Sequence, residues 1–406
     1  MKIIKADFIL TPNEIMEEKA VAFEKNIIDI DSFEKLISKY PAAEIIETPK
    51  NSILLPGLIN SHVHLEFSAN RASLSYGDFL IWLNSVIKKR EKLIKKCQNN
   101  CLQNAVTSML KSGTTAFGAI SSYGYDMEIC AKSPQRVVFF NEIIGSNPAA
   151  ADILFSDFLQ RLEESQKHKS DRFFPAVAVH SPYSVHTILA KKAIEVAKKN
   201  KMPISCHFME SKAEREWLDN DKGDFAKFFK EFLNQSTAAN RPEEFLQLFE
   251  ETDTLFVHAV HTNDKELEII QKQNNVIVHC PVSNRLLGNG VLNIPKLEDK
   301  NITMLLATDG LSSNFSLNLF EEMKAALFLH PNIEPVKLAK KLIDSVTKNA
   351  AKALRLECGE IEKGKWADMI ICELPEDLEN KEDAYLHLIL HGENPKMVLI
   401  GGEIYD

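Results

Sequence analysis

Two histidines separated by one residue give the sharpest chemical signal in the sequence. His62 and His64 follow an apolar run and the sequence Pro-Gly-Leu-Ile-Asn-Ser. Side chains two residues apart in a strand point to the same side, so both imidazoles can reach one metal ion at the end of the strand. By themselves, two such histidines also suit an ordinary surface or core position. The other potential ligands decide between these interpretations.

Further potential ligands lie at or near the ends of predicted strands. His207, His258 and His279 each end a short apolar run, and Asp309 follows one. In a barrel of parallel strands the active site lies at the carboxyl ends of the strands. Three imidazoles and one carboxylate suit a divalent transition metal ion, zinc or iron, that keeps an open position for water. The pattern therefore predicts one metal ion at this end of the strands.

A glutamate close to His207 adds a candidate proton carrier. Glu210 follows His207 by three residues, so its carboxyl can lie beside the metal site while the imidazole binds the ion. Metal-assisted hydrolysis needs a carboxyl that moves a proton from the activated water to the substrate. The alternative is a glutamate that only stabilises a helix N-terminus through the helix dipole.

The elements that must position these residues alternate between strands and helices. Between about residues 57 and 350, short apolar runs such as 114–120 and 137–144 alternate with amphipathic segments such as 190–200 and 319–329. This alternation is typical of βα units with parallel pairing. About eight such units predict a distorted (β/α)8 TIM barrel over 57–350, although length alone would also allow two or three domains.

Short β-like runs with glycine turns occupy both ends of the chain. Residues 1–56 and 351–406 therefore predict the two parts of one small β-sandwich domain, built from both termini around the catalytic barrel.

Composition excludes several classes of protein. Lys and Arg number 48 against 57 Asp and Glu, a net charge of −9 without a strong basic cluster, so a nucleic-acid partner is not expected. The sequence has neither an apolar run of the ~18 residues that span a membrane nor an N-terminal signal segment. Seven scattered cysteines without CxxC spacing argue against a disulfide framework. We therefore expect a cytoplasmic protein with no membrane partner.

Several motifs together resemble the amidohydrolase superfamily, and more narrowly its mononuclear aminohydrolases that act on purines, adenosine derivatives and triazines. The resemblance covers essentially the whole chain, because residues 364–370 (GKWADMI) also match the closing β-domain of that family. The other matching segments are 55–65 (LPGLINSHVHL), 113–115 (GTT), 180–185 (HSPYSV), 207–210 (HFME), 258–264 (HAVHTND), 279–290 (HCPVSNRLLGNG) and 307–314 (ATDGLSSN).

Carried over residue by residue, the resemblance implies a role for each site residue. The implied metal ligands are His62, His64, His207 and Asp309. Glu210 would protonate the ring nitrogen next to the reacting carbon, His258 would orient the attacking water, and Asp309 would accept a proton from that water. His279 and Asn284 match a family motif near the site. The sequence offers no candidate for the bridging carboxylated lysine of binuclear members, which favours one metal ion, and the family suggests a homodimer.

The segment 66–90 is similar to the corresponding stretch of the aminofutalosine deaminases. This similarity implies a small-molecule nucleoside substrate, 6-amino-6-deoxyfutalosine, converted to futalosine and ammonia in menaquinone biosynthesis. The benzoate of this substrate needs apolar contacts, and its carboxylate needs a cationic or hydrogen-bonding partner. Trp82 can supply the apolar contact or pack on the barrel as part of an amphipathic helix. The candidate substrate-binding residues are Glu66 for the ribose hydroxyls, Arg90, Arg285 and His180 for the carboxylate, and Trp82, His279 and Asn284.

Other functions remain open from the sequence. The substrate can be another adenosine derivative, such as methylthioadenosine, S-adenosylhomocysteine or adenosine, or it can be guanine or cytosine. A chlorotriazine or cyclic-amide hydrolase is a second alternative, and Glu210 argues against cyclic-amide members. A barrel with a purely structural metal is the third, but four ligands would close such a site without a base beside it.

Overall fold

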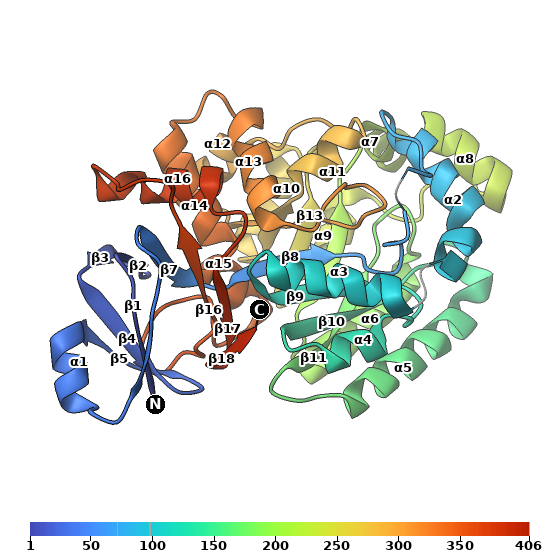
Figure 1. Cartoon of the computed structure of the whole chain (residues 1–406). Helices are drawn as coiled ribbons and strands as arrows, with labels where there is room; N and C mark the ends of the chain where they lie inside the picture. The colour runs from blue at the N-terminus through green and yellow to red at the C-terminus, as the bar shows by residue number, and fades with distance from the viewer. Residues whose placement is uncertain (71, 97–98, 406) are drawn as a thin grey trace. The chain divides into compact units, whose positions relative to one another are not determined.

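The largest sheet of the structure, a computed structural model that describes residues 1–70, 72–96 and 99–405, is an eight-stranded barrel (Figure 1). Its strands neighbour one another in sequence order, and every register between β10 and β15 is parallel. The strands are β8 (Leu58–Val63), β9 (Thr114–Ser121), β10 (Arg136–Ile143), β11 (Phe173–Val179), β12 (Ile204–Phe208), β13 (Thr254–His258), β14 (Val276–His279) and β15 (Met304–Leu306).

Hydrogen bonds bring the first and last barrel strands together. The Ser61 hydroxyl donates to the carbonyl oxygen of Leu306 at 3.3 Å, and the backbone N–H of Asp309 donates to the carbonyl of His62 at 3.2 Å. The barrel is therefore nearly closed, and the predicted (β/α)8 architecture is confirmed.

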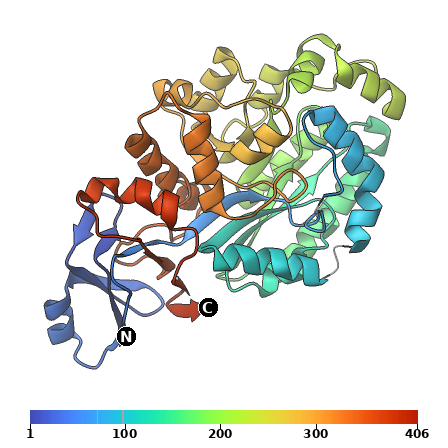
Figure 2. The ribbon, with the colours of Figure 1, turned by 45° about the horizontal axis from the view of Figure 1, so that its top comes forward.

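Helices separate the barrel strands along the chain, and α5 and α6 lie outside the strands that precede them (Figures 1 and 2). The helices between β8 and β15 are α2 (Phe79–Lys96), α3 (Asn99–Lys111), α4 (Met127–Lys132), α5 (Ala151–Lys167), α6 (Thr187–Asn200), α7 (Lys212–Asn220), α8 (Asp224–Leu233), α9 (Pro242–Gln247), α10 (Asp264–Lys272), α11 (Pro281–Leu286) and α12 (Ile294–Asp299). After β15 come α13 (Leu319–Leu329), α14 (Pro335–Ser345) and α15 (Lys348–Leu354).

The sequence of α6 explains why it packs on the barrel. Its buried residues recur at three- and four-residue intervals, which places them on one face. They are Leu189, Ala190, Ala193, Ile194 and Ala197. The helix ends at Asn200, because Lys201 adopts a left-handed conformation with φ of 53°.

Strands from both ends of the chain share one six-stranded sheet. Within it, β7 (Ser52–Pro56) pairs antiparallel with β16 (Met369–Glu373), and Leu54 faces Ile371 in that register. Its other strands are β2 (Phe8–Leu10), β3 (Ile15–Glu17), β17 (Met397–Ile400) and β18 (Glu403–Tyr405). The prediction that the two termini build one sheet is confirmed.

A second, four-stranded sheet completes the terminal β-structure. Its strands are β1 (Lys2–Lys5), β4 (Lys19–Phe23), β5 (Ile27–Ser32) and β6 (Glu44–Ile46), and two helices, α1 (Phe33–Lys39) and α16 (Ala384–His391), belong to the same terminal segments. Ile4 and Phe23 from this sheet share one buried cluster with Leu54, Ile371 and Leu399 from the other. The two sheets therefore enclose a common apolar core, as in a sandwich.

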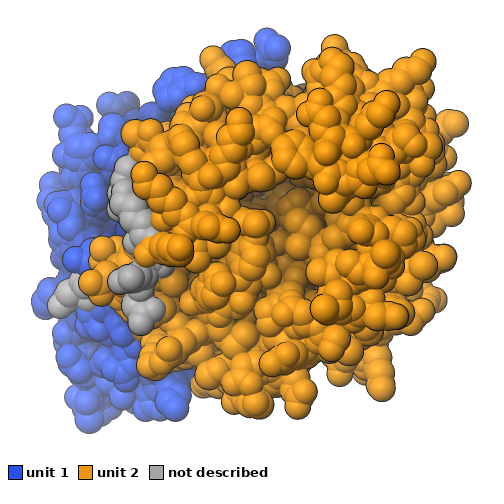
Figure 3. Space-filling model, turned by 90° about the vertical axis from the view of Figure 1, so that its right-hand side faces the viewer, with its two compact units in different colours: residues 1–60, 106–117, 318–406 blue, residues 61–105, 118–317 orange. Residues whose placement is uncertain are grey.

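By compactness the chain divides into two units, residues 1–60, 106–117 and 318–406, and residues 61–105 and 118–317 (Figure 3). The domain boundaries near residues 56 and 350 stay a prediction. No helix in the described ranges is long and apolar enough to cross a membrane. Cys101 is disulfide-bonded, whereas Cys130, Cys206 and Cys372 are free thiols.

Candidate active site

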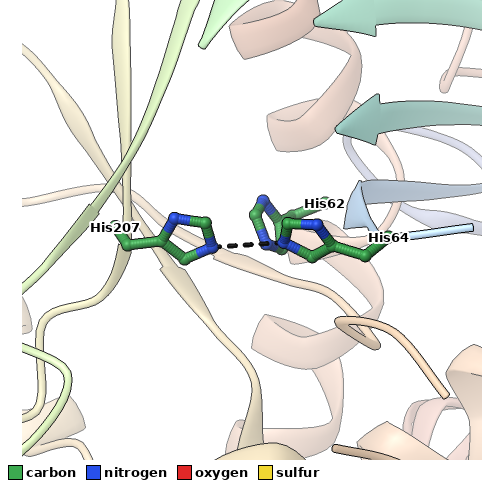
Figure 4. Close-up of side chains that lie close together, drawn as sticks. All are labelled: His62, His64 and His207. Atoms are coloured by element: carbon green, nitrogen blue, oxygen red, sulfur yellow. Dashed lines mark hydrogen bonds between the residues drawn. The ribbon is translucent and has the colours of Figure 1, made fainter. Parts of the chain in front are cut away.

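Three histidines face one another at the carboxyl ends of two barrel strands (Figure 4). His62 and His64 come from the end of β8, and His207 comes from β12. The Nε2 atoms of His64 and His207 are 3.2 Å apart, and each of the three rings offers a ligand atom within 4.8 Å of the others. His62 and His64 therefore lie on the same side of the chain, as the alternation of side chains along a strand predicts.

Asp309, which follows β15, reaches the same point. Its Oδ1 lies 3.8 Å from Nε2 of His62 and 3.7 Å from Nε2 of His64. Ligand atoms bonded to a tetrahedral ion at roughly 2.1 Å lie about 3.4 Å from one another. The separations between these nitrogen and oxygen atoms are close to that spacing, so the four side chains fit a single metal ion.

The protonation of the imidazoles also suits a metal ion. Nδ1 of His207 donates to the carbonyl oxygen of His180 at 2.8 Å, which leaves the Nε2 lone pair directed at the site. Burial lowers the pKa of His62 and of His207 well below the usual value, so both rings are neutral. Nε2 of His62 is buried and has no hydrogen-bond partner among the described residues. A bound cation would satisfy this nitrogen.

Hydrogen bonds orient the Asp309 carboxylate. The hydroxyls of Ser283 and Ser313 donate to its Oδ2 at 2.7 and 2.8 Å, and the N–H of Gly310 donates to Oδ1. Burial alone would raise the pKa of Asp309, but the nearby imidazoles, that of His64 foremost, and the Ser283 hydroxyl lower it below its usual value. The carboxylate is therefore ionised, as both a metal ligand and a base require.

Glu210 lies immediately beside these ligands, in the loop between β12 and α7. Its Oε1 accepts a hydrogen bond from the Asn289 amide at 3.1 Å and lies 3.7 Å from Nε2 of His258. Burial, with Asp309 and Glu214 nearby, raises the pKa of Glu210 well above its usual value. A protonated carboxyl can donate to a substrate nitrogen, so the environment gives Glu210 the properties of a general acid.

His258 ends β13 and faces the same space. Its Nδ1 donates to the amide oxygen of Asn284 at 2.9 Å, because that oxygen can only accept. Burial lowers the pKa of His258, so its Nε2 carries a lone pair, 4.0 Å from Oδ2 of Asp309. The residue adopts φ of 72°, in the left-handed region that few residues other than glycine occupy. Such strain is concentrated at functional sites.

A cavity extends from this cluster within the unit formed by residues 61–105 and 118–317, whose surface shows a hollow in Figure 3. The lining residues that belong to the cluster are His64, His207, Glu210, His258 and Asp309. The lining residues of α2 are Phe79, Trp82, Leu83, Val86, Ile87 and Arg90. Their spacing places them on one face of α2. The apolar residues of such a face could equally pack on the barrel. In this structure they line the cavity.

Two of the predicted substrate-binding residues on α2 lie at the cavity. Trp82 donates its indole N–H to the carbonyl oxygen of Ser312 at 2.8 Å, which fixes the ring. Arg90 is exposed and donates to the Tyr123 hydroxyl at 3.3 Å. His180 also lines the cavity.

Four other predicted substrate-binding residues are not among the described lining residues. Arg285 is exposed on α11, and His279 is fully buried at the end of β14. The amide oxygen of Asn284 already accepts the hydrogen bond from Nδ1 of His258. Glu66 accepts the backbone N–H groups of Ser122, Tyr123 and Tyr125, so it holds a loop rather than reaching the cavity. Sequence spacing cannot reveal bonds between segments so far apart in the chain.

Among the lining residues that reasoning from the sequence missed are Ser122, Tyr123, Glu142 and Tyr183. For Glu142 a signal existed, because it is an ionisable residue near the end of an otherwise largely apolar predicted strand, 137–144. Reasoning from the sequence also missed Glu214, whose carboxylate accepts the backbone N–H groups of Met209 and Glu210 at 3.1 and 2.8 Å.

Comparison with known proteins agrees with this geometry. The model of the amidohydrolase family matches residues 53–405. A Nitratiruptor protein named aminodeoxyfutalosine deaminase is 56% identical over 403 residues, which cover 99% of each chain. A Helicobacter pylori protein named adenosine deaminase is 36% identical over 412 residues, again 99% of each chain.

A solved structure gives the same result. The crystal structure of Helicobacter pylori aminofutalosine deaminase in complex with methylthio-coformycin is 35% identical and superposes with a TM-score of 0.95, covering 100% of both chains. With the match over residues 53–405, these similarities establish that the chain belongs to the amidohydrolase family.

Proposed function

We propose that this protein is a metal-dependent hydrolytic deaminase that converts 6-amino-6-deoxyfutalosine to futalosine and ammonia, a step of menaquinone biosynthesis. The observation that carries the proposal is the convergence of four potential metal ligands with Glu210 and His258 beside one cavity. The relatives named for deamination of aminofutalosine support the substrate.

His62, His64, His207 and Asp309 would hold one divalent transition metal ion. Such an ion lowers the pKa of a bound water towards ~7, which supplies hydroxide at neutral pH. Zinc and iron both accept this set of nitrogen and oxygen ligands.

The side chains around that ion divide the proton transfers between them. In hydrolytic deamination, water adds to the carbon that bears the amino group, the carbon–nitrogen bond breaks, and ammonia leaves. Asp309 accepts the proton that the attacking water loses, and His258, with its Nε2 lone pair directed at the site, orients that water. Glu210 donates a proton to the adjacent ring nitrogen, which neutralises the charge that develops there. Asp309 then passes its proton to the amino group, which leaves as ammonia, and the added hydroxyl returns a proton to Glu210 as the carbonyl forms. Proton transfer by one positioned group typically contributes ~10²- to 10⁴-fold to the rate.

We propose that Arg90 binds the benzoate carboxylate. Of the three candidates for this contact, Arg285 does not line the cavity, and His180 is a neutral ring because burial lowers its pKa to about 3. Arg90 is the last of the lining residues of α2, beyond an apolar stripe that suits the benzoate ring. A guanidinium forms strong, charge-assisted hydrogen bonds with a carboxylate.

The proposal extends to the assembly and location of the protein. We expect a homodimer, which light scattering after size-exclusion chromatography would detect, and a cytoplasmic location, which cell fractionation would test. We also propose that the functional division is a catalytic barrel over 57–350 with a β-domain formed by 1–56 and 351–406.

A second candidate function is deamination of a simpler adenosine nucleoside. Relatives named adenosine deaminase and 5'-deoxyadenosine deaminase are 36% and 31% identical to this chain.

The test of the proposed function incubates the purified, metal-loaded protein with 6-amino-6-deoxyfutalosine and quantifies released ammonia while mass spectrometry identifies the product. Stoichiometric ammonia and futalosine are expected. Turnover of adenosine without turnover of 6-amino-6-deoxyfutalosine would replace the proposal with this second candidate.

A further inference from the structure

Glu142 is a buried carboxylate at the cavity wall for which the proton transfers above provide no role. It is 1% exposed and lies one residue before the end of β10. The side chain of the preceding residue, Asn141, donates to the Ser165 hydroxyl on α5 at 3.0 Å, so it points outward to the helices. Because successive side chains of a strand alternate, Glu142 points into the barrel.

The two carboxylate oxygens of Glu142 differ in their hydrogen bonding. Oε2 accepts a hydrogen bond from the Ser122 hydroxyl, which fixes the carboxylate in place. Oε1 is buried and has no hydrogen-bond partner within the part of the chain that the structure describes. Since an unsatisfied buried acceptor is costly, and buried polar atoms are normally paired, this oxygen is suited to a donor supplied by a ligand.

A second metal ion is not the ligand that this geometry favours. Glu142, His180 and His207 each offer a potential ligand atom within 4.8 Å of the others. However, Nδ1 of His207 is bonded to the His180 carbonyl, and its Nε2 faces His64 at 3.2 Å. His207 therefore has no nitrogen left for a second ion while it serves the first. The remaining pair of one carboxylate and one imidazole is too few for a closed site.

Hydroxyl groups are the donors that a nucleoside brings to such an oxygen. We propose that Glu142 accepts a hydrogen bond from a ribose hydroxyl of the substrate and thereby selects ribonucleosides over their deoxy forms. This inference rests on the proposed deaminase function and assigns the hydroxyl contact to Glu142 instead of Glu66, whose carboxylate already accepts three backbone N–H groups.

The test compares kcat/KM for 6-amino-6-deoxyfutalosine with its 2′-deoxy and 3′-deoxy forms, using the wild-type protein, Glu142→Ala and Glu142→Gln. A hydrogen bond to a charged group predicts that the wild type loses about 10- to 100-fold on at least one deoxy form. Glu142→Ala should lose a similar factor on the parent substrate, mainly through KM, and should no longer discriminate against that deoxy form. The metal content of the variant should equal that of the wild type.

Glu163→Gln is the matched control, because Glu163 is exposed on α5 and its substitution removes the same charge. It should discriminate as the wild type does. Equal kcat/KM of the wild type for all three nucleosides would overturn the inference even if neither Glu142 variant folds. Unchanged discrimination in a folded Glu142→Ala, or loss of a second metal ion from it, would also overturn the inference. The proposed function fails separately, if the wild type does not deaminate the parent substrate.

Discussion

Burial sets the chemistry of the individual side chains in the cavity. Two carboxyl groups lie within a few ångströms of His258, yet their environments separate them. The imidazole of His64 and the Ser283 hydroxyl lower the pKa of Asp309, whereas burial beside other carboxylates raises the pKa of Glu210 well above its usual value. Such a pair can supply a base and an acid at one pH, which is what hydrolytic deamination requires.

The first prediction concerns the acid. Glu210→Gln preserves the shape of the side chain and its contact with Asn289 but cannot transfer a proton. We expect kcat to fall at least 100-fold while the metal content remains at the wild-type level, measured by steady-state kinetics and elemental analysis. A loss of less than tenfold would show that Glu210 has only a structural role.

The second prediction concerns the carboxylate contact. Arg90→Met keeps the length of the apolar stem but removes the charge, so KM for 6-amino-6-deoxyfutalosine should rise about 10- to 100-fold. The kcat/KM for adenosine, which has no carboxylate, should stay within a factor of two or three. Lys88→Met is the matched control, because Lys88 is exposed on the same helix and does not line the cavity. Equal effects of Arg90→Met on both substrates would contradict the assignment.

The proximity of the central side chains could be predicted from the sequence, while much of their surroundings could not. His62, His207 and Asp309 end or follow apolar strands, and a parallel barrel brings all such positions to one face. Glu66 and Arg285 occupy a loop and a short helix, where spacing does not determine direction. Glu66 accepts three backbone N–H groups of a loop more than fifty residues away in the sequence, which no local pattern reveals.

At the scale of elements, the loops after the barrel strands are held by polar contacts with the helices that follow. Glu214 in the first turn of α7 bonds the backbone of Met209 and Glu210. Arg215, the next residue, donates to the carbonyl of His261 and to both carboxylate oxygens of Glu266 on α10. Helix α7 therefore connects the loop after β12, which carries Glu210, with the loop that follows His258 at the end of β13.

The third prediction tests that connection. The Glu266 carboxylate is fully buried, so Arg215→Met would leave it without its cationic partner. Removal of one partner from a buried pair typically costs about 3–5 kcal/mol of unfolding free energy. Thermal denaturation should show a clearly lower midpoint for Arg215→Met than for Lys212→Met, which removes a charge from the exposed surface of the same helix. Equal midpoints would mean that this pair contributes little to stability.

At the scale of the whole molecule, strands from the C-terminal segment join the same sheet as strands from the N-terminal segment. A composition of short β runs at both ends was enough to predict a shared β-domain, because such short strands need partners to be stable. The pairing of β7 with β16 shows the outcome. The division of the chain into compact units was not predictable in the same way, because residues 106–117 and 318–406 belong with the termini by packing rather than by sequence pattern.

The fourth prediction concerns removal of the metal ion. Its proposed ligands lie on separate barrel strands or in the loops that follow them. A metal ion held by His62, His207 and Asp309 would connect β8, β12 and the loop after β15, and it would bind the folded state only. Chelation should therefore remove activity and lower the thermal midpoint, and one equivalent of zinc or ferrous ion per chain should restore both. Full activity after complete metal removal would refute the proposed mechanism.

The most direct test of the proposed function is a comparison of kcat/KM for 6-amino-6-deoxyfutalosine, methylthioadenosine, S-adenosylhomocysteine and adenosine at identical metal loading. Because Arg90 and the apolar stripe of α2 line the cavity beyond the catalytic cluster, we predict a clear preference for 6-amino-6-deoxyfutalosine, at least tenfold from the carboxylate contact alone. If adenosine is deaminated with equal kcat/KM, the benzoate is not recognised, and the proposed substrate is contradicted.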